Sequence, residues 1–481
     1  MRASRSDSDR RRVLILVPVV SRDFEGHALV AWHLRSRFGH DVRFCSAHDL
    51  QEQVLSYAPD VLVLDRLDTR AGKAQLAKRL GMKVVLLPTL GFVQDGLDTE
   101  ELRAGKREGG RELLDCCFTW GERSRDLLVE RGILDADVVH AVGAARFDLY
   151  QQPYISLAQP RSELLAASGI VDDGSPLITW TTNTFHTLDG MRESAVARAV
   201  STGVVERDFR AQIDDEGTAF DDISRAVTEL ARRHPEWRFL IKLHPSELAA
   251  PYESLAAGAS NVHVLRGASI RDVLHHSAAL LTHCSTTATE AWMLGKPVLE
   301  VMFGKYLVQS PAEYMEGNHV VTGLAGMEKL LEECVAGASG ALPEAQLRVR
   351  DDYLRTLYFR MDGRAGERCA EHIDALLAPA RHDDAAHERI GSDAAEEYRV
   401  WQSKHDRRLS SRVRRAFGIG RRQSLQFWTR SFWTQLLGRN ELRPWEVEVT
   451  PEMVRESFAR FDTAVRSGAA TGRDASYAVA R

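Results

Sequence analysis

Short apolar runs alternate with longer amphipathic stretches along the first 150 residues. Runs of four to eight residues rich in Val, Ile and Leu predict strands, and the stretches between them have the spacing of helices. Strands with continuous apolar character are typical of a parallel sheet that is covered on both faces. We therefore expect a Rossmann-like domain over residues 13–150. The predicted strands cover 13–20, 42–46, 61–65, 83–88, 116–120 and 138–142, and the predicted helices cover 24–38, 50–57 and 71–80.

A second alternation of the same kind follows a polar segment at 151–168. It predicts another Rossmann-like domain over residues 169–378. Two such domains facing a cleft form the GT-B arrangement, so the expected fold class is α/β with two Rossmann-like domains and a mainly helical C-terminal extension. The predicted strands are 176–180, 238–243, 262–265, 278–281 and 297–302, and the predicted helices are 221–233 and 270–276.

The two ends of the chain differ from these domains in composition. Residues 1–12 are basic and rich in Ser, which predicts a disordered leader, and residues 381–403 are acidic and rich in Ala, which predicts a linker. Residues 404–481 are predicted to form a helical extension. Between 404 and 443 it combines many Arg residues with Trp, Phe and Leu, a pattern of helices that bind anionic membrane surfaces. A helix that packs this face onto the first domain explains the pattern equally well.

Composition narrows the class of protein. The chain has 481 residues, 44% hydrophobic and 27% charged, with a formal net charge of −5. An acidic balance argues against a general nucleic-acid binder. The six cysteines have no metal-type spacing, and the apolar runs fall short of the roughly 18 residues of a membrane-spanning helix. These features predict reduced thiols and a cytoplasmic protein without a metal site or a cofactor.

Polar motifs follow two of the strands predicted for the second domain. His244 and Pro245 come after the strand at 238–243, and a Ser-Thr-Thr run with a glutamate follows the strand at 278–281. Open α/β sheets bind ligands at the carboxyl ends of their strands, and hydroxyls at a helix start bind anions. We expect a phosphate of a nucleotide to lie here, with the glutamate on a ribose. The residues of the second motif are Ser285, Thr286, Thr287 and Glu290.

A capping box is the structural alternative for the second motif. Thr287 and Glu290 have the Thr-x-x-Glu spacing of that motif. Other histidines of the chain are expected to be structural, as histidines in apolar or capping contexts usually are. They are His186, His263, His275, His276 and His283.

Together these motifs resemble those of bacterial surface-carbohydrate and capsule biosynthesis glycosyltransferases. The resemblance covers about residues 13–378, and the chain has Ala144-Ala145 where relatives often have Asn-Pro. It implies that Thr182 and Asn183 join the donor site. It also marks hinge or substrate residues in the first domain. The matching elements are Arg22, 119–121 (Thr-Trp-Gly), 142–148 with Gly143, Arg146 and Asp148, Thr182-Asn183, 244–247, 285–290 and 362–364 (Asp-Gly-Arg).

Asp95 is the candidate general base. Sialyl- and ulosonyl-transferases with a His-Pro motif have an acidic residue before a glycine in the first domain, which Asp95-Gly96 resembles, although Gln94 departs from their pattern. A turn aspartate is the alternative. The acidic stretch at 214–217 is predicted to be a solvated loop.

The expected reaction is metal-independent glycosyl transfer in cell-surface polysaccharide synthesis. Asp95 would take a proton from an acceptor hydroxyl, while His244 and the Ser/Thr motif hold the departing nucleotide. The resemblance allows an ulosonic acid from a CMP donor as the sugar, and a glycan or a lipid-linked acceptor. Three alternatives stay open: a nucleotide-sugar 2-epimerase, a polyol-phosphate transferase, and a nucleotide-binding protein without activity.

Overall fold

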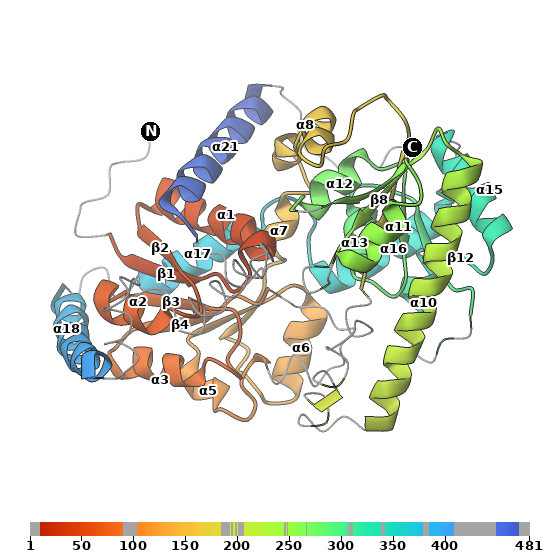
Figure 1. The fold of residues 1–481 in the computed structure, drawn as a ribbon. Coiled ribbons are helices and arrows are strands. Elements are labelled where there is room, and N and C mark those ends of the chain that lie inside the picture. Colours follow the sequence, from red (N-terminus) through yellow and green to blue (C-terminus); the bar gives the residue numbers. More distant parts are fainter. Residues whose placement is uncertain are drawn as a thin grey trace. The chain divides into compact units, whose positions relative to one another are not determined.

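The chain folds into two compact units (Figure 1). The first contains Met1–Ser156 and Arg355–Arg481, and the second contains Leu157–Leu354. Residues 355–378, which the sequence pattern assigns to the second domain, thus pack in the first unit. The computed structural model describes residues 10–89, 103–183, 193, 196–197, 200, 206–244, 247, 249–265, 267–304, 306, 311–337, 342–378, 384–407 and 449–470.

The first unit is built on a parallel six-stranded sheet of order β2-β1-β3-β4-β5-β6. Each strand is short and apolar, as the sequence pattern predicts. Since the order reverses direction after β1, the sheet has a topological switch point between β1 and β3. The strands are β1 (Arg12–Leu16), β2 (Asp41–Cys45), β3 (Val61–Leu64), β4 (Lys83–Leu86), β5 (Cys116–Thr119) and β6 (Val139–Ala141).

Alternate residues of these strands fill two different cores. In β1, Val13 and Ile15 pack with α1, α7 and α17, whereas Leu14 and Leu16 pack with α2, α3 and α18. Figure 1 shows these helices on the two sides of the sheet. The helices of this unit are α1 (Val20–Phe38), α2 (Leu50–Tyr57), α3 (Ala71–Arg79), α5 (Gly110–Leu113), α6 (Glu122–Glu130), α7 (Ala145–Asp148), α17 (Ala365–Leu377), α18 (Asp384–Arg407) and α21 (Pro451–Ala470), with a 3₁₀ helix, η3, at Tyr154–Leu157.

The described parts of the C-terminal region form two helices that belong to the first unit. Helix α18 spans most of the segment predicted to be a linker, and Ile390 and Ala394 are buried against α2 and α3. Of the alanines that suggested a linker, Ala394 thus forms part of a buried apolar helix face. Helix α21 packs on α1, where the Trp32 indole Nε1 donates to Asp462 at 2.9 Å. No helix in the described ranges is both long and apolar enough to cross a lipid bilayer.

The second unit has its own parallel six-stranded sheet, of order β12-β11-β10-β7-β8-β9. The chain runs from β7 outward through β8 to β9 and then returns to β10 on the other side of β7. This is the order of doubly wound nucleotide-binding folds, with the switch point between β7 and β10. The strands are β7 (Leu177–Thr181), β8 (Arg238–Lys242), β9 (Val262–Leu265), β10 (Ala279–Thr282), β11 (Val298–Val301) and β12 (His319–Val321).

Helices cover both faces of this sheet as well. Trp180, Leu281 and Leu299 pack with α10, α11 and α15, while Leu177 and Leu240 pack with α8 and α12. The helices are α8 (Arg161–Ala166), α10 (Glu206–Arg233), α11 (Ala250–Ala256), α12 (Ile270–His276), α13 (Thr287–Met293), α14 (Ala312–Glu316), α15 (Leu324–Val335) and α16 (Glu344–Tyr358), whose last residues belong to the first unit.

All of the predicted strands are present, so the predicted fold class of two parallel α/β sheets with a helical C-terminal region is confirmed. Two details differ. Residues 214–217, predicted to be a loop, lie inside α10, because the long amphipathic helix begins at Glu206 rather than near residue 221. Strand β12 was not predicted, since His319–Val321 offers only three residues, with Val320 exposed.

Candidate functional site

The candidate site lies at the carboxyl ends of β7, β8 and β10 in the second unit. Since β7 pairs with β8 on one side and β10 on the other, the segments that follow these three strands emerge together. Thr182 and Asn183 follow β7, His244 follows β8, and the turn at 283–286 follows β10. The structure thus brings together most of the residues that the sequence assigns to a donor site.

Thr182 connects the ends of β7 and β8. Its hydroxyl accepts a hydrogen bond from the backbone N–H of His244 at 2.9 Å and donates to the carboxylate of Glu247. The Tyr252 hydroxyl donates to the same carboxylate at 3.1 Å. Both Thr182 and Glu247 are buried, so these bonds fix the backbone at His244. Pro245 lies outside the described residues.

Asn183 connects the end of β7 to the turn after β10. Its amide Nδ2 donates to the backbone carbonyls of His283 at 2.8 Å and Cys284 at 3.3 Å. Cys284 has φ of 46°, in the left-handed region that a residue other than glycine rarely adopts. The turn is therefore held in a strained conformation, a feature that is common at functional sites.

Three hydroxyls form a continuous chain where helix α13 begins. Thr181 Oγ1 lies 2.7 Å from Thr287 Oγ1, which in turn lies 3.0 Å from Ser285 Oγ. Thr286 precedes the helix and is exposed, whereas Glu290 is buried one turn later. The N-cap residue of this helix is Thr286, whose side chain makes no capping hydrogen bond, whereas the capping-box alternative places Thr287 at that position. The Ser285 hydroxyl accepts a hydrogen bond from the Thr287 backbone N–H at 3.4 Å. These hydroxyls lie at the switch point between β7 and β10.

His283 is held within this turn. Its Nδ1 lies 2.9 Å from the carbonyl oxygen of Val301, and its ring centroid lies 4.5 Å from that of Tyr306. Burial lowers the pKa of His283, although the carbonyl contact and nearby carboxylates oppose the shift. A neutral imidazole that donates to a backbone carbonyl fits the structural role predicted for this histidine.

His283, Cys284 and Glu300 could in principle hold a metal ion. One ligand atom from each lies within 4.8 Å of the others. Both oxygens of Glu300, however, already accept hydrogen bonds within the protein, from the Cys284 backbone N–H on one side and from the Asn318 amide on the other, where the Tyr314 hydroxyl also lies 3.3 Å away. We therefore assign no metal to this group.

The matching residues of the first unit lie in a different environment. Arg22 Nε pairs with Asp23 at 2.6 Å, and Arg22 Nη2 donates to the Thr89 hydroxyl at 3.3 Å. The Arg146 guanidinium lies over the Trp120 and Phe147 rings, 5.2 Å and 4.5 Å from their centroids. The two arginines thus make structural contacts within the first unit, Arg22 with an acidic partner and Arg146 with aromatic rings.

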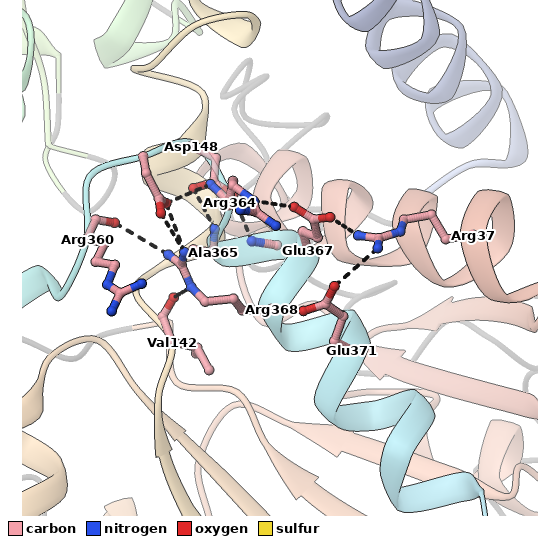
Figure 2. A network of polar contacts seen from close by, with 11 residues as sticks. Arg37, Val142, Asp148, Arg360, Arg364, Ala365, Glu367, Arg368 and Glu371 are labelled. Carbon is pink, nitrogen blue, oxygen red and sulfur yellow. Dashed lines mark hydrogen bonds and ion pairs between the residues drawn. The ribbon is translucent and has the colours of Figure 1, made fainter. Parts of the chain in front are cut away.

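Asp148 belongs to a polar network that anchors helix α17 (Figure 2). Its carboxylate accepts hydrogen bonds from the backbone N–H groups of Ala365 at 3.0 Å and Gly366 at 2.7 Å. Arg368 continues the network by donating to the carbonyl of Val142 at 2.8 Å and pairing with Asp362 at 2.8 Å. Figure 2 also shows Arg37 bound by two glutamates of the same helix, Glu367 and Glu371.

Steric constraints explain why two positions of these motifs are glycines. Gly143 has φ of 87°, and a Cβ on Gly121 would lie 2.5 Å from the carbonyl oxygen of Leu357. Such a contact is too close for any other residue. Several motifs that carry the family resemblance in the first unit thus join the returning segment at 355–371 to the first sheet.

Several predicted features fall outside the described residues. They are Asp95, Pro245, His186 and most of the basic, aromatic segment, residues 408–448. Their assignments stay predictions. A surface hollow of about 490 Å³ lies in the first unit beside β6, lined among others by His140 and His372, and none of the predicted site residues lines it.

The sequence did not reveal the two buried residues that support the turn of the candidate site, Glu300 and Tyr314. Glu300 is completely buried in β11, and Tyr314 is completely buried in α14. The signal was present, because a glutamate inside the apolar run Val298–Val301 is unusual for a strand that is buried on both faces. Tyr314 gave no such signal, since its position depends on how α14 packs.

No protein-family model and no curated protein matches the chain. Solved structures do match, and of three such structures two carry the name UDP-N-acetylglucosamine 2-epimerase. The Listeria monocytogenes protein has a TM-score of 0.52 at 12% identity, covering 77% of this chain and 97% of its own. The Neisseria meningitidis enzyme, bound to UDP-GlcNAc, has a TM-score of 0.51 at 15% identity, covering 76% and 99%. S. aureus MnaA with UDP has a TM-score of 0.51 at 13% identity, covering 76% and 97%.

At these identities the likeness shows the fold alone, which is the GT-B type expected from the sequence. The structures give no support to the narrower resemblance to sialyl- and ulosonyl-transferases. The chain is thus similar in fold to enzymes of nucleotide-sugar chemistry.

Proposed function

We propose that the chain is an enzyme that acts on a nucleotide sugar and binds the phosphates of that sugar at the carboxyl edge of the second sheet. The observation that carries this proposal is the convergence of His244, Asn183 and the Ser285 turn at the switch point between β7 and β10. Doubly wound sheets bind nucleotides at this point.

The chemistry of the site suits a phosphate group. The hydroxyls of Ser285 and Thr287 can donate hydrogen bonds to an anion, and so can the imidazole of His244, which follows β8, the strand next to β7. Donors that are fixed before the ligand arrives stabilise a departing nucleotide without reorganisation. The site therefore supports both binding of a donor and departure of its nucleotide.

The reaction we favour is metal-independent glycosyl transfer in cell-surface polysaccharide synthesis. An acceptor hydroxyl loses its proton to a general base and bonds to the anomeric carbon, while the bond from that carbon to the nucleotide phosphate breaks. Asp95 is the base in this proposal, on the strength of its motif. The acceptor is a glycan or a lipid-linked sugar.

A nucleotide-sugar 2-epimerase is the second candidate. It is favoured by the Listeria monocytogenes and Neisseria meningitidis structures, whose proteins are named for that activity. Such an enzyme would use the same donor site without an acceptor. The two candidates therefore differ in whether nucleotide release depends on a second substrate.

Calorimetry with CMP, CDP, UDP, GDP and their sugars tests the shared part of the proposal. A nucleotide that binds is then supplied as its sugar, with and without glycan acceptors. Release of nucleotide only with acceptor supports a transferase, and a 2-epimer formed without acceptor supports the epimerase. Transfer of a polyol phosphate, or binding without turnover, would point to the remaining alternatives. If no nucleotide binds to the folded protein, the proposal is wrong.

The membrane hypothesis belongs to the same proposal, because a lipid-linked acceptor must be reached at a surface. Arginines near an anionic surface contribute roughly 1 kcal/mol each, less at high salt. Co-sedimentation with anionic vesicles should therefore fall with salt and with deletion of residues 403–443. A full-length protein that ignores such vesicles at low salt would leave packing within the protein as the role of this segment.

A further inference from the structure

A completely buried carboxyl group lies directly beneath the turn that carries Ser285. Glu300 is in β11, opposite Thr282 of β10 in the strand register. Its neighbours Leu299 and Val301 point into the apolar core on one face of the sheet, so Glu300 points to the other face. A carboxyl group in such a place is destabilising unless hydrogen bonds compensate for its lost hydration.

Those hydrogen bonds come from the turn and from its surroundings. One oxygen of Glu300 accepts the backbone N–H of Cys284, and the other lies 3.3 Å from both the Asn318 amide nitrogen and the Tyr314 hydroxyl. Asn318 is oriented by Trp292, whose indole N–H donates to its Oδ1 at 2.9 Å. Since an indole can only donate, the Asn318 NH2 group must face Glu300.

Side chains hold the backbone at each residue between His283 and Ser285. Glu300 holds the N–H of Cys284, Asn183 holds the carbonyls of His283 and Cys284, and the Tyr314 hydroxyl donates to the carbonyl of Ser285 at 2.7 Å. Cys284 needs this support, because φ of 46° is costly for a residue with a Cβ. Without it the turn would relax and Ser285 would move.

The hydrogen count indicates which form of Glu300 fits best. Tyr314 has one hydroxyl hydrogen, and its shorter contact, 2.7 Å, is to the carbonyl of Ser285. The 3.3 Å contact between Tyr314 and Glu300 then becomes a hydrogen bond only when Glu300 carries the proton. Burial, the largest influence, raises the pKa of Glu300 to about 7, against the opposing effect of the Cys284 N–H. The titratable groups that face it are the Tyr314 phenol and the Cys284 thiol.

We propose that Glu300 is a positioning residue of the donor site, which holds Cys284 in its left-handed conformation and thereby aims the hydroxyls of Ser285 and Thr287 at the phosphate. This inference rests on the proposed function, because it assumes that the turn receives a phosphate. Glu300 itself is completely buried, so it acts through the turn rather than on the ligand.

Glu300→Leu is the disruptive variant and Glu300→Gln is the conservative one. Leu leaves the Cys284 N–H without its acceptor, so the affinity for UDP or CMP, whichever binds the parent protein, should fall about tenfold to a hundredfold. Gln still accepts that N–H and resembles the protonated acid, so affinity should stay within about threefold of the parent. The pH dependence of affinity that Glu300 causes near neutrality should disappear in the Gln variant.

A glycine at position 284 tests whether Glu300 acts by holding the turn in its left-handed conformation or only stabilises the fold. Glycine adopts positive φ without a side-chain penalty, so Cys284→Gly should restore much of the affinity lost in Glu300→Leu. Cys284→Ala keeps a Cβ and should restore none of it. Thr179→Val is the matched control, since Thr179 is a buried hydroxyl in the middle of β7 that bonds to Ser277, at 2.6 Å, rather than to the turn.

The test is to measure nucleotide affinity by calorimetry, using variants that circular dichroism shows to be folded. Unchanged affinity in Glu300→Leu, or equal affinity in the Gly and Ala double variants, would overturn the inference while leaving the donor site in place. Failure of the parent protein to bind either nucleotide would overturn the proposed function, and the inference with it.

Discussion

The carboxyl edges of the two sheets differ in the polar groups that they carry. In the second unit the switch point carries neutral donors, the hydroxyls of Ser285 and Thr287, in a turn that the amide of Asn183 holds. In the first unit the corresponding edge carries charged pairs, Arg22 with Asp23 at 2.6 Å and others after β3. Both sheets are parallel and six-stranded, so the difference lies in side chains and strand order rather than in architecture.

This difference indicates a division of tasks. Neutral donors held by buried partners can receive an anion without first breaking an ion pair, which suits a phosphate site. Arginines that already pair with carboxylates are less available to a ligand. We therefore expect substitutions in the second unit to change nucleotide affinity, and substitutions in the first unit to change turnover or stability.

The largest effect is expected for Asp95→Asn. If Asp95 is the general base, turnover should fall about a hundredfold or more while nucleotide affinity is unchanged, because the base acts on the acceptor. Asp98→Asn, three residues along, is the matched control. Parental turnover in the Asp95→Asn variant would place the base elsewhere, and Asp23 or Glu25 would be tested next.

The fold was predictable because burial on both faces gives each strand a recognisable apolar run. The donor motifs were predictable for a related reason, since polar residues directly after a buried strand must emerge at the edge of the sheet. What the sequence does not contain is the pairing of distant segments. The contact of Asp148 with the N-terminus of α17 joins residues 217 positions apart, and the support of Ser285 by Tyr314 depends on how α14 packs.

A double substitution in the turn, Ser285→Ala with Thr287→Val, should weaken nucleotide binding about tenfold to a hundredfold for each lost contact. His244→Ala should act in the same direction. The measurement is calorimetry on folded protein, with Thr179→Val as the control in the same sheet. Unchanged affinity in the double variant would contradict the donor site and remove the contrast between the two edges.

Asp148 in the first unit and Glu300 in the second are both buried carboxyl groups. We expect Asp148 to affect the stability of the fold, whereas Glu300 should affect nucleotide affinity. Burial raises the pKa of Asp148 from 3.8 to about 7, although the amides of Ala365 and Gly366 oppose the shift. The folded state therefore keeps a proton that the unfolded state has lost, so this contribution to stability is present below pH 3.8 and is lost as pH rises towards 7.

Asp148→Asn should remove that part of the pH dependence and change the free energy of unfolding by about 1 kcal/mol, because one hydrogen-bond acceptor for α17 is kept. Urea unfolding at several pH values measures both quantities. Nucleotide affinity should not change, in contrast to Glu300→Leu. A pH dependence equal to that of the parent would show that Asp148 titrates normally.

Arg22→Ala is expected to leave nucleotide affinity nearly unchanged. Arg22 belongs to the motifs of the family resemblance, yet its guanidinium pairs with Asp23 and contacts Thr89. The Asp23 side chain is completely buried, so removal of the guanidinium leaves a buried carboxylate that still accepts the Val19 N–H, and a loss of stability of about 1–3 kcal/mol is expected. Nucleotide affinity should change by less than about twofold. Urea unfolding and calorimetry measure the two quantities, and Arg125→Ala, which removes an exposed ion pair with Asp126 in the same unit, is the control. A tenfold loss of affinity in the Arg22→Ala variant alone would mean that this arginine contacts the nucleotide, and the division of tasks between the two edges would have to be abandoned.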